Sequence, residues 1–309
     1  METMLNNRVS TILSAIEWVH ARFEGSELHY GHGSDNPWDE ACYLVLSAME
    51  LPLDADESMG ALPVSDHGWH QIEAWTKARI ETRKPLSYLV GRAWFCGLPF
   101  YVNESVLIPR SPLAELILSR FEPWVSSDKP LRILDLCTGS GCIALAIAGV
   151  FEDAEVVGTD ISPDALRVAD KNLDNLSARE DMKNLKARVR FVQADVFDCV
   201  DGRDALGAFD VIIANPPYVD QEEMDRLPLE YRHEPVLGLE SGGDGLDVTR
   251  RILMGAYRHL NENGVLLCEV GASKAHLEEA FLELPFVWFE FESGAEGVFL
   301  LNRQDLAGL

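Results

Sequence analysis

The 309-residue chain has few basic residues and no long hydrophobic run. Its 26 lysines and arginines stand against 51 acidic residues, which gives a net charge of −25. Free nucleic-acid binders carry a basic face for the phosphates, so this charge argues against direct nucleic-acid readout. No segment approaches the roughly 18 uncharged apolar residues of a membrane span, and residues 1–10 lack the features of a secretory signal. We therefore expect a cytoplasmic protein.

Metal and disulfide frameworks are also missing from the sequence. The six cysteines, at positions 42, 96, 137, 142, 199 and 268, include no C-x-x-C pair, a spacing common in structural zinc sites. His67 and His70 lie three residues apart on an expected helix, but no further ligand cluster accompanies them. We expect no structural zinc, no disulfides and no metal in the functional site.

The first 85 residues read as a helical domain. Apolar residues at helical spacing form one expected stripe: Val9, Ile12, Leu13, Ile16, Val19 and Phe23. The pattern predicts a second helix over about 38–49 and a third over 66–83. Trp69, Ile72 and Trp75 of the third helix should face a core. We assign residues 1–85 to an N-terminal helical domain.

The pattern changes near Pro85. Residues 88–95 and 98–102 are aromatic and β-branched and are separated by Cys96-Gly97, which is typical of a β-hairpin. Ser111-Pro112 should then open a helix, with serine at the N-cap and proline at the first helical position. These features predict a β-hairpin linker over 86–110 and a second domain over 111–309.

From residue 131 onward, strand-like and helix-like segments alternate. The predicted strands are residues 132–136, 155–159, 189–192, 209–214, 264–270, 286–291 and 298–301, and one predicted helix covers 162–176. Alternating units of this kind imply a mostly parallel sheet with helices on both faces. We predict an α/β, Rossmann-like domain with a seven-stranded sheet.

A glycine-rich turn follows the first of these strands. The segment Asp135-Leu-Cys-Thr-Gly-Ser-Gly141 runs directly into an apolar helix, and its glycines let the backbone turn tightly against a ligand. The next strand ends at Asp160, whose carboxylate can accept hydrogen bonds from both hydroxyls of an adenosine ribose. Ligands of open α/β sheets bind at this carboxyl edge. These features predict a nucleoside cofactor.

The turn alone leaves the identity of the cofactor open. Dinucleotide-binding enzymes share both features, although G-x-G-x-x-G is complete here only if Ala144 replaces the third glycine. There is no triphosphate-binding G-x-x-x-x-G-K-[ST] loop, and Ser140 lacks the G-x-S-x-G surroundings of a hydrolase nucleophile. Asp195, at the end of the third strand, could accept a hydrogen bond from an adenine amino group or could cap a helix.

The fourth predicted strand ends in Asn215-Pro216-Pro217-Tyr218. An amide nitrogen is a poor nucleophile because its lone pair is delocalised, so a methylating enzyme must hold its NH₂ group in line with the methyl donor. The Asn215 side-chain oxygen and the Pro216 carbonyl can accept the two N–H groups, and Tyr218 offers a flat surface. Alone, the motif could be a turn or a proline-rich ligand. After a glycine turn and two strand-end aspartates, it indicates N-methyl transfer.

These residues resemble the class I methyltransferases that modify amino groups through an Asn-Pro-Pro-Tyr motif, among them DNA adenine and protein glutamine methyltransferases. The resemblance to the protein glutamine N-methyltransferases covers nearly the whole chain, including Leu107-Ile-Pro-Arg-Ser-Pro112. It implies use of S-adenosylmethionine, release of S-adenosylhomocysteine, and substrate recognition by residues 1–85. The implied cofactor residues are Asp135, Thr138, Gly139, Ser140, Gly141, Asp160, Asp195 and Asn215. The residues implied to hold the glutamine are Arg110, Asn215, Pro216, Pro217 and Tyr218.

The segment after Arg110 separates two branches of that family. The branch that modifies release factors carries Pro-Arg-Pro, an acidic residue, Thr and Glu, whereas this chain continues Ser111-Pro-Leu-Ala-Glu115. It is similar to the branch that methylates a glutamine of large-subunit ribosomal protein three, which implies a basic ribosomal protein as partner. Solubility explains the acidic charge as well as attraction of such a partner does. Arg110, His233 and Glu234 are either substrate-side groups or internal hydrogen-bonding partners.

Three alternative functions stay open. A release-factor methyltransferase would share the chemistry. A DNA adenine methyltransferase would need a basic groove and a target-recognition region, which a net charge of −25 and a helical N-terminus do not suggest. A ribosome-assembly factor without turnover would keep the fold, but the intact turn, Asp160 and the Asn-Pro-Pro-Tyr motif argue against it.

Overall fold

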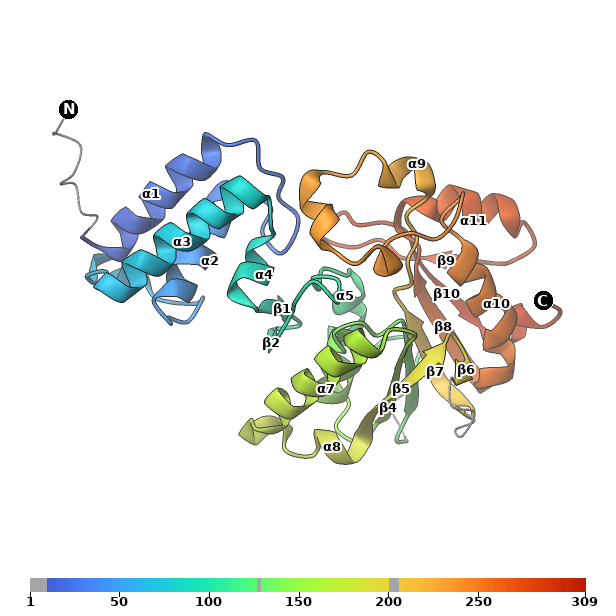
Figure 1. Cartoon of the computed structure of the whole chain (residues 1–309). Helices are drawn as coiled ribbons and strands as arrows, with labels where there is room; N and C mark the ends of the chain where they lie inside the picture. The colour runs from blue at the N-terminus through green and yellow to red at the C-terminus, as the bar shows by residue number, and fades with distance from the viewer. Residues whose placement is uncertain (1–9, 127–128, 200–205) are drawn as a thin grey trace. The chain divides into compact units, whose positions relative to one another are not determined.

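The computed structural model describes residues 10–126, 129–199 and 206–309, which divide into two units (Figure 1). Unit 1 consists of Met1–Arg92 and Pro228–His233, and unit 2 consists of Ala93–Leu227 and Glu234–Leu309. The chain therefore leaves unit 2 after Leu227, contributes a short segment to unit 1, and returns. In the described part of the chain, no helix combines the length and apolarity that a membrane span requires.

Unit 1 is helical. Its elements are α1 (Ile12–Glu24), α2 (Pro37–Ala48), the 3-10 helix η1 (Glu57–Ala61), α3 (Asp66–Thr82), α4 (Leu86–Val90) and η3 (Leu229–His233). Thr11, Asn36 and Ser65 cap the three long helices, because their side chains accept hydrogen bonds from backbone N–H groups of the first turn. The hydrophobic core gathers residues of α1, α2 and α3, such as Phe23, Leu44 and Ile72.

The predicted apolar stripe of the first helix is wrong at one position. Ile12, Ile16, Val19 and Phe23 are buried, whereas Leu13 is 47% exposed. A residue directly after Ile12 points about 100° away around the helix, so it leaves the buried face. Val9 lies outside the described residues. In the third helix, Ile72 is fully buried, while Trp69 and Trp75 are half-buried at the margin of the core.

The predicted hairpin is shorter than expected and begins later. Strands β1 (Ala93–Phe95) and β2 (Leu98–Phe100) pair antiparallel, but residues 88–90 belong to α4 rather than to a strand. The aromatic and β-branched residues there favour a strand, yet burial of Leu86 and Tyr88 on a helical face overrides that propensity. A left-handed Gly91, at φ 70°, ends the helix. Part of the expected linker therefore lies in unit 1.

Unit 2 contains an eight-stranded sheet in its described residues, in the order β6-β5-β4-β3-β7-β8-β10-β9. The strands are β3 (Arg132–Leu136), β4 (Glu155–Asp160), β5 (Val189–Asp195), β6 (Asp198–Cys199), β7 (Phe209–Ala214), β8 (Leu260–Glu269), β9 (Val287–Trp288) and β10 (Val298–Asn302). The five central strands, from β5 to β8, are parallel to one another. The mostly parallel sheet is thus confirmed. The short β6 is an eighth strand that the sequence pattern did not predict, and β9 is shorter than predicted.

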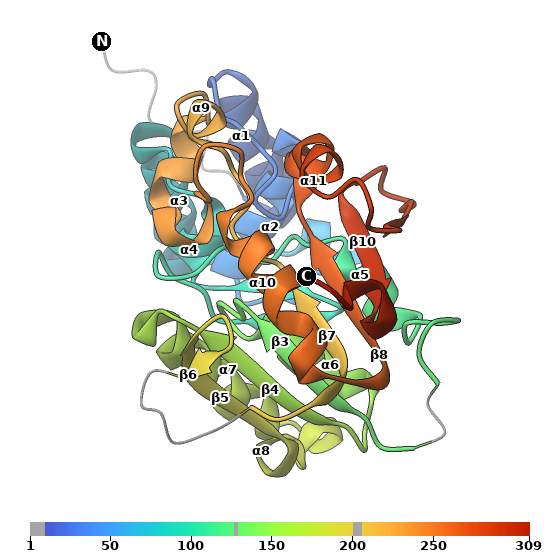
Figure 2. The same cartoon turned by 90° about the vertical axis from the view of Figure 1, so that its right-hand side faces the viewer.

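Helices cover both faces of this sheet, as Figure 2 shows. One face carries α5 (Leu113–Leu118), α6 (Cys142–Val150), α7 (Pro163–Ser177) and α8 (Leu185–Arg188). The other face carries α10 (Asp247–His259), α11 (Lys274–Ala280) and the 3-10 helix η6 (Arg303–Leu306). The remaining short elements are η2 (Glu180–Met182), α9 (Gln221–Met224), η4 (Val236–Gly238) and η5 (Gly271–Ser273).

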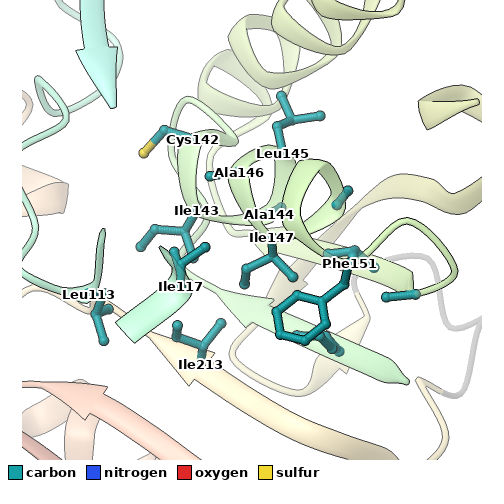
Figure 3. Packing of buried hydrophobic residues seen from close by; sticks show 14 of the residues in the cluster. Leu113, Ile117, Cys142, Ile143, Ala144, Leu145, Ala146, Ile147, Phe151 and Ile213 are labelled. Carbon is teal, nitrogen blue, oxygen red and sulfur yellow. The ribbon is translucent and has the colours of Figure 1, made fainter. Parts of the chain in front are cut away.

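The core between the sheet and α6 is closely packed. Figure 3 shows Ile143 and Ile147 of α6 beside Ile117 of α5 and Ile213 of β7, and all four side chains are buried. Burying aliphatic side chains of this size stabilises a fold by about 1.5–3 kcal/mol each. This packing fixes α6, and with it the glycine turn from which α6 begins.

Candidate active site at the carboxyl edge of the sheet

The sequence motifs meet at one edge of the unit 2 sheet. Strands β5, β4, β3, β7 and β8 are parallel neighbours, so their carboxyl ends share that edge. Asp195, Asp160, Asn215 and Glu269 end or directly follow four of these strands, and the glycine turn follows β3. After β3 the chain forms β4 and β5 on one side of that strand, and it then forms β7 and β8 on the other side. The order of strands thus reverses between β3 and β7, and ligands of open α/β sheets bind at such a switch point.

The glycine turn is shaped by close contacts. Gly141 begins α6 with φ 76°, and a Cβ atom at this position would come within 2.8 Å of the Phe191 ring. Only glycine avoids both the left-handed strain and that clash. Asn172 of α7 also donates to the Ser140 carbonyl over 2.9 Å. The turn is therefore held by packing and hydrogen bonds.

Asp135 lies fully buried beneath this turn. Its Oδ2 accepts hydrogen bonds from Thr138 Oγ1 over 2.5 Å and from the Ala144 N–H over 3.1 Å. Its Oδ1 is buried and has no hydrogen-bond partner among the described residues. Burial raises the Asp135 pKa to about 7, against the opposing effect of those hydrogen bonds. A buried acceptor of this kind fits a ligand that brings a donor or a positive charge.

Asp160 is positioned by the glycine turn and by the start of α7. Its two carboxylate oxygens accept hydrogen bonds from the Gly139 and Ser162 N–H groups, each over 2.9 Å. Burial raises the Asp160 pKa, and the backbone hydrogen bonds oppose that change. A carboxylate oxygen has two lone pairs, so Asp160 retains acceptors for the ribose hydroxyls that the sequence predicts.

Asp195 does not cap a helix, because the chain passes from β5 through a turn into β6. Its Oδ1 accepts a hydrogen bond from Arg251 of α10 over 2.8 Å. Val196 follows with φ 59°, a conformation that is rare and strained for a β-branched residue. Such strain is concentrated at ligand and active sites. Contact with adenine stays a prediction.

The Asn-Pro-Pro-Tyr motif directly follows β7. Pro216 and Pro217 are buried, and Asn215 and Tyr218 are half-buried. Tyr218 Oη donates to Glu269 Oε1 over 2.9 Å, and Ser273 Oγ donates to the Tyr218 carbonyl over 2.8 Å. Proline fixes φ at two successive positions, so the motif is restrained by its own backbone and by β8 and η5.

Arg110 and Glu234 form an internal ion pair. The two Arg110 Nη atoms donate to the two Glu234 oxygens over 2.6 and 2.7 Å, and the Ile108 N–H donates to the same carboxylate over 3.0 Å. In unit 1, His233 Nε2 lies 2.9 Å from the Thr82 carbonyl oxygen. The structure thus gives all three residues internal partners, and their contact with a substrate stays a prediction.

Glu269 was missed by the sequence analysis. It is 5% exposed, and it accepts hydrogen bonds from both Tyr218 and Ser111. The available signal was a single acidic residue after the apolar run of residues 265–268, at the end of a predicted buried strand. A buried acid at that position requires hydrogen-bond donors, so it marks a polar site.

No group of three or more His, Cys, Asp and Glu side chains that could hold a metal ion occurs in residues 10–126, 129–199 and 206–309. The acidic residues at the sheet edge accept hydrogen bonds from hydroxyl, backbone and guanidinium donors. These carboxylates offer acceptors, which fit an organic ligand that donates from hydroxyl and amino groups.

Comparison with known proteins defines the class first. Residues 127–290 match the family described as "Methyltransferase domain", so this chain is a methyltransferase, and its domain and fold imply use of S-adenosylmethionine. The hMettl16 catalytic domain, solved in complex with the MAT2A 3'UTR hairpin 6, is 17% identical with a TM-score of 0.50, covering 78% of this chain and 83% of that one. At that identity the likeness concerns the fold alone.

Two full-length relatives then define the family. The ribosomal protein uL3 glutamine methyltransferase of Francisella tularensis is 42% identical, over 97% of this chain and 92% of the relative. The protein of the same name from Xanthomonas campestris is 41% identical, over 97% and 94% of the two chains. The chain belongs to the family of ribosomal protein uL3 glutamine methyltransferases. The family resemblance seen in the motifs is thereby confirmed, while the roles of individual residues stay predictions.

Proposed function

We propose that this chain transfers a methyl group from S-adenosylmethionine to the side-chain amide nitrogen of a glutamine in ribosomal protein uL3. The observation that carries the proposal is the position of Asn215-Pro216-Pro217-Tyr218 at the end of β7, adjacent to the β3 strand that leads into the glycine turn. Full-length relatives that carry this activity in their names support the choice of substrate.

Three acidic residues of the sheet edge would hold the cofactor. Asp160 accepts hydrogen bonds from the ribose hydroxyls, Asp195 accepts one from the adenine amino group, and the buried Asp135 Oδ1 offers an acceptor beneath the turn. When bound, S-adenosylmethionine supplies an electrophilic methyl group on a positively charged sulfur. The turn residues Thr138, Gly139, Ser140 and Gly141 bring the backbone close to it, and Asn215 lies on the substrate side.

The motif residues would orient the glutamine amide. Asn215 Oδ1 and the Pro216 carbonyl accept its two N–H groups, and the Tyr218 ring lies against the amide plane. Holding both N–H groups favours a pyramidal nitrogen whose lone pair is available. The nitrogen becomes acidic as it gains the methyl group, so water or a nearby acceptor can take its proton. Positioning and electrostatics therefore supply most of the rate enhancement.

The net charge of the chain is compatible with the partner that the family suggests. A ribosomal protein binds RNA through basic residues, and a chain with a net charge of −25 attracts such a protein before it is assembled. This attraction should weaken as salt is added. The encounter would take place in the cytoplasm. The enzyme would recognise its substrate through protein surface and not through nucleic-acid bases.

The test offers three purified acceptors side by side with S-adenosylmethionine carrying a labelled methyl group. The acceptors are uL3, a peptide-chain release factor and duplex DNA, and Asn215→Ala protein serves as the control. Label on uL3 alone, lost in the control, is the expected result. Label on the release factor or on DNA in place of uL3 would overturn the proposed substrate. Cofactor binding without label on any acceptor would overturn the proposed activity.

A further inference from the structure

Tyr218 is held at its side chain and at its backbone. Its Oη donates to Glu269 Oε1 over 2.9 Å, and its carbonyl accepts from Ser273 Oγ over 2.8 Å. The ring packs against Gly271, where a Cβ atom would come within 2.6 Å of a ring carbon. Glycine at position 271 therefore lets the backbone approach the ring closely. The hydrogen bond to Glu269 is what fixes the outer end of the side chain.

Glu269 is in turn oriented by Ser111. The Ser111 hydroxyl lies 2.5 Å from Glu269 Oε2, and the two residues are 8% and 5% exposed. A carboxylate has only acceptors, so Ser111 and Tyr218 each donate to one of its oxygens. Donors on both oxygens fix the plane of the carboxyl group. Because removing a donor from a buried acid is costly, these two hydroxyl groups are not interchangeable with apolar groups.

The Ser111 hydroxyl is itself aimed by its neighbours in the chain. The Leu113 N–H donates to Ser111 Oγ over 3.2 Å, which leaves the single hydroxyl proton for Glu269. The preceding residue, Arg110, is fixed by its two hydrogen bonds to Glu234. Ser111 was expected to be an N-cap, and although α5 is assigned from Leu113, Ser111 Oγ accepts the Leu113 N–H of its first turn, as a capping serine does. The serine therefore accepts a hydrogen bond from the start of α5 and donates its own proton to Glu269.

We propose that Glu269, oriented by Ser111, is a positioning residue that fixes the Tyr218 ring against the glutamine amide. This inference rests on the proposed function for the role of Tyr218, and it adds a chain of hydrogen bonds from the segment before α5 to the reactive motif. Ser111 and Glu269 act through Tyr218 and are not themselves catalytic residues. Charge-assisted hydrogen bonds of this kind are among the stronger ones in proteins.

A double-mutant cycle tests the proposal. Ser111→Ala should lower kcat for methyl transfer by about tenfold, which corresponds to about 1.4 kcal/mol. Tyr218→Phe, which keeps the ring and removes the hydroxyl, should lower kcat at least as much. In the Tyr218→Phe background, Ser111→Ala should change kcat by less than about twofold, because its effect runs through the missing hydroxyl. Ser111→Thr retains a hydroxyl and should restore most of the activity.

Additive effects of Ser111→Ala and Tyr218→Phe on kcat would overturn the proposal, since a merely structural serine would act independently. The matched control is Ser119→Ala, which removes an exposed hydroxyl just after the same helix and should leave kcat unchanged. Affinity for S-adenosylhomocysteine, measured by calorimetry, should stay the same in every variant.

A second readout separates this proposal from the proposed function. With tyrosine labelled by carbon-13 at Cζ, the Tyr218 resonance is assigned by its loss in Tyr218→Phe. It should shift in Ser111→Ala and stay in place in Ser119→Ala, whatever substrate the enzyme uses. An unshifted resonance in Ser111→Ala would overturn the inference even if methyl transfer to uL3 is found. A shifted resonance without any methyl transfer would instead refute the proposed function.

Discussion

The two units bury acidic side chains in different surroundings. In unit 1, Arg79 donates to Glu40 over 2.6 Å, to Glu230 over 3.1 Å and to the His29 carbonyl over 2.7 Å. The hydrogen bonds accepted by Asp135 and Glu269 in unit 2 come instead from hydroxyl groups and a backbone N–H group. Glu40 and Glu230 of unit 1 thus accept hydrogen bonds from an internal cation, as the buried Glu234 of unit 2 does from Arg110, whereas the hydrogen bonds to Asp135 and Glu269 come from neutral donors.

The pKa directions show what this difference means. In unit 1, burial raises the Glu230 pKa, but hydrogen bonds from the His29 N–H and from Arg79 outweigh it and lower the value overall. Burial prevails for Glu40, whose pKa is raised in spite of Arg79. In unit 2, burial raises the pKa of both Asp135 and Glu269. A buried acid without a hydrogen-bonded cation can respond to a ligand, so Glu40 and Glu230 should act mainly on stability, whereas Asp135 and Glu269 should also act on the site.

The largest expected effect sharpens that contrast. Asn215→Ala removes one of the two proposed acceptors for the amide and should lower kcat by roughly 10³-fold. Thermal stability and affinity for S-adenosylhomocysteine should change little. The matched control is Asn184→Ala, at an exposed position where the side chain makes no cap hydrogen bond. Normal turnover in Asn215→Ala would contradict the mechanism.

In unit 1, Arg79→Met should show the opposite pattern, a large loss of stability. Removing the cation leaves Glu40 buried without this ion-pair partner and leaves Glu230 with the longer Arg83 pair at 3.8 Å, which costs about 3–5 kcal/mol. Denaturant unfolding followed by circular dichroism measures this loss. Lys77→Met, on the same helix in an exposed pair with Glu81, should change stability by less than about 1 kcal/mol. Similar stabilities for Arg79→Met and Lys77→Met would contradict the stabilising role assigned to the buried ion pairs of Arg79.

A third variant tests whether Asp160, at the end of β4, binds the cofactor. Asp160→Ala should weaken binding of S-adenosylhomocysteine by roughly 10- to 100-fold, as expected for lost hydrogen bonds to a charged group. Isothermal titration calorimetry gives the affinity. Glu155→Ala, at the exposed opposite end of the same strand, is the control and should bind normally. Unchanged affinity in Asp160→Ala would remove Asp160 from the proposed cofactor site.

The remaining prediction concerns pH. The Asp135 pKa is raised to about 7, whereas the unfolded chain has a value of about 3.9. Between those values the folded protein holds a proton that the unfolded chain has lost, so this residue makes stability fall as pH rises from about 4 to about 7. Asp135→Asn keeps an acceptor oxygen and should flatten that part of the profile. Parallel profiles for the two proteins, measured by thermal unfolding, would contradict the assignment.

Much of the fold could be predicted because its signals are local. The strands β3 and β7 begin and end where the sequence pattern places them, since short, mainly apolar segments flanked by turn residues indicate buried parallel strands. The predicted start of the hairpin was wrong, because Tyr88 and Val90 favour a strand by residue type, whereas tertiary packing places them in α4. Likewise, nothing local shows that residues 228–233 join unit 1.

In the candidate site, too, residues marked by a local pattern were predicted and residues joined by distant contacts were not. The glycine turn, Asp160 and Asn215 were predicted to share an edge because each directly follows a predicted strand, and parallel strands align those ends. Glu269 and Ser111 were not predicted to meet, because they are 158 positions apart in the sequence. The serine gave a local cap signal, which agrees with the hydrogen bond it accepts from the Leu113 N–H, but that signal says nothing of its donation to Glu269. Residues that position others through distant contacts leave no spacing pattern to detect.

The most direct test of the central claim is to locate the methyl group. After incubation of uL3 with S-adenosylmethionine and the purified enzyme, tandem mass spectrometry of uL3 peptides should find the mass increment of one methyl transfer on a glutamine side chain. The increment should be absent when Asn215→Ala protein replaces the wild type. A methyl group on a lysine, an arginine or a chain terminus, or one that persists with Asn215→Ala, would contradict the account.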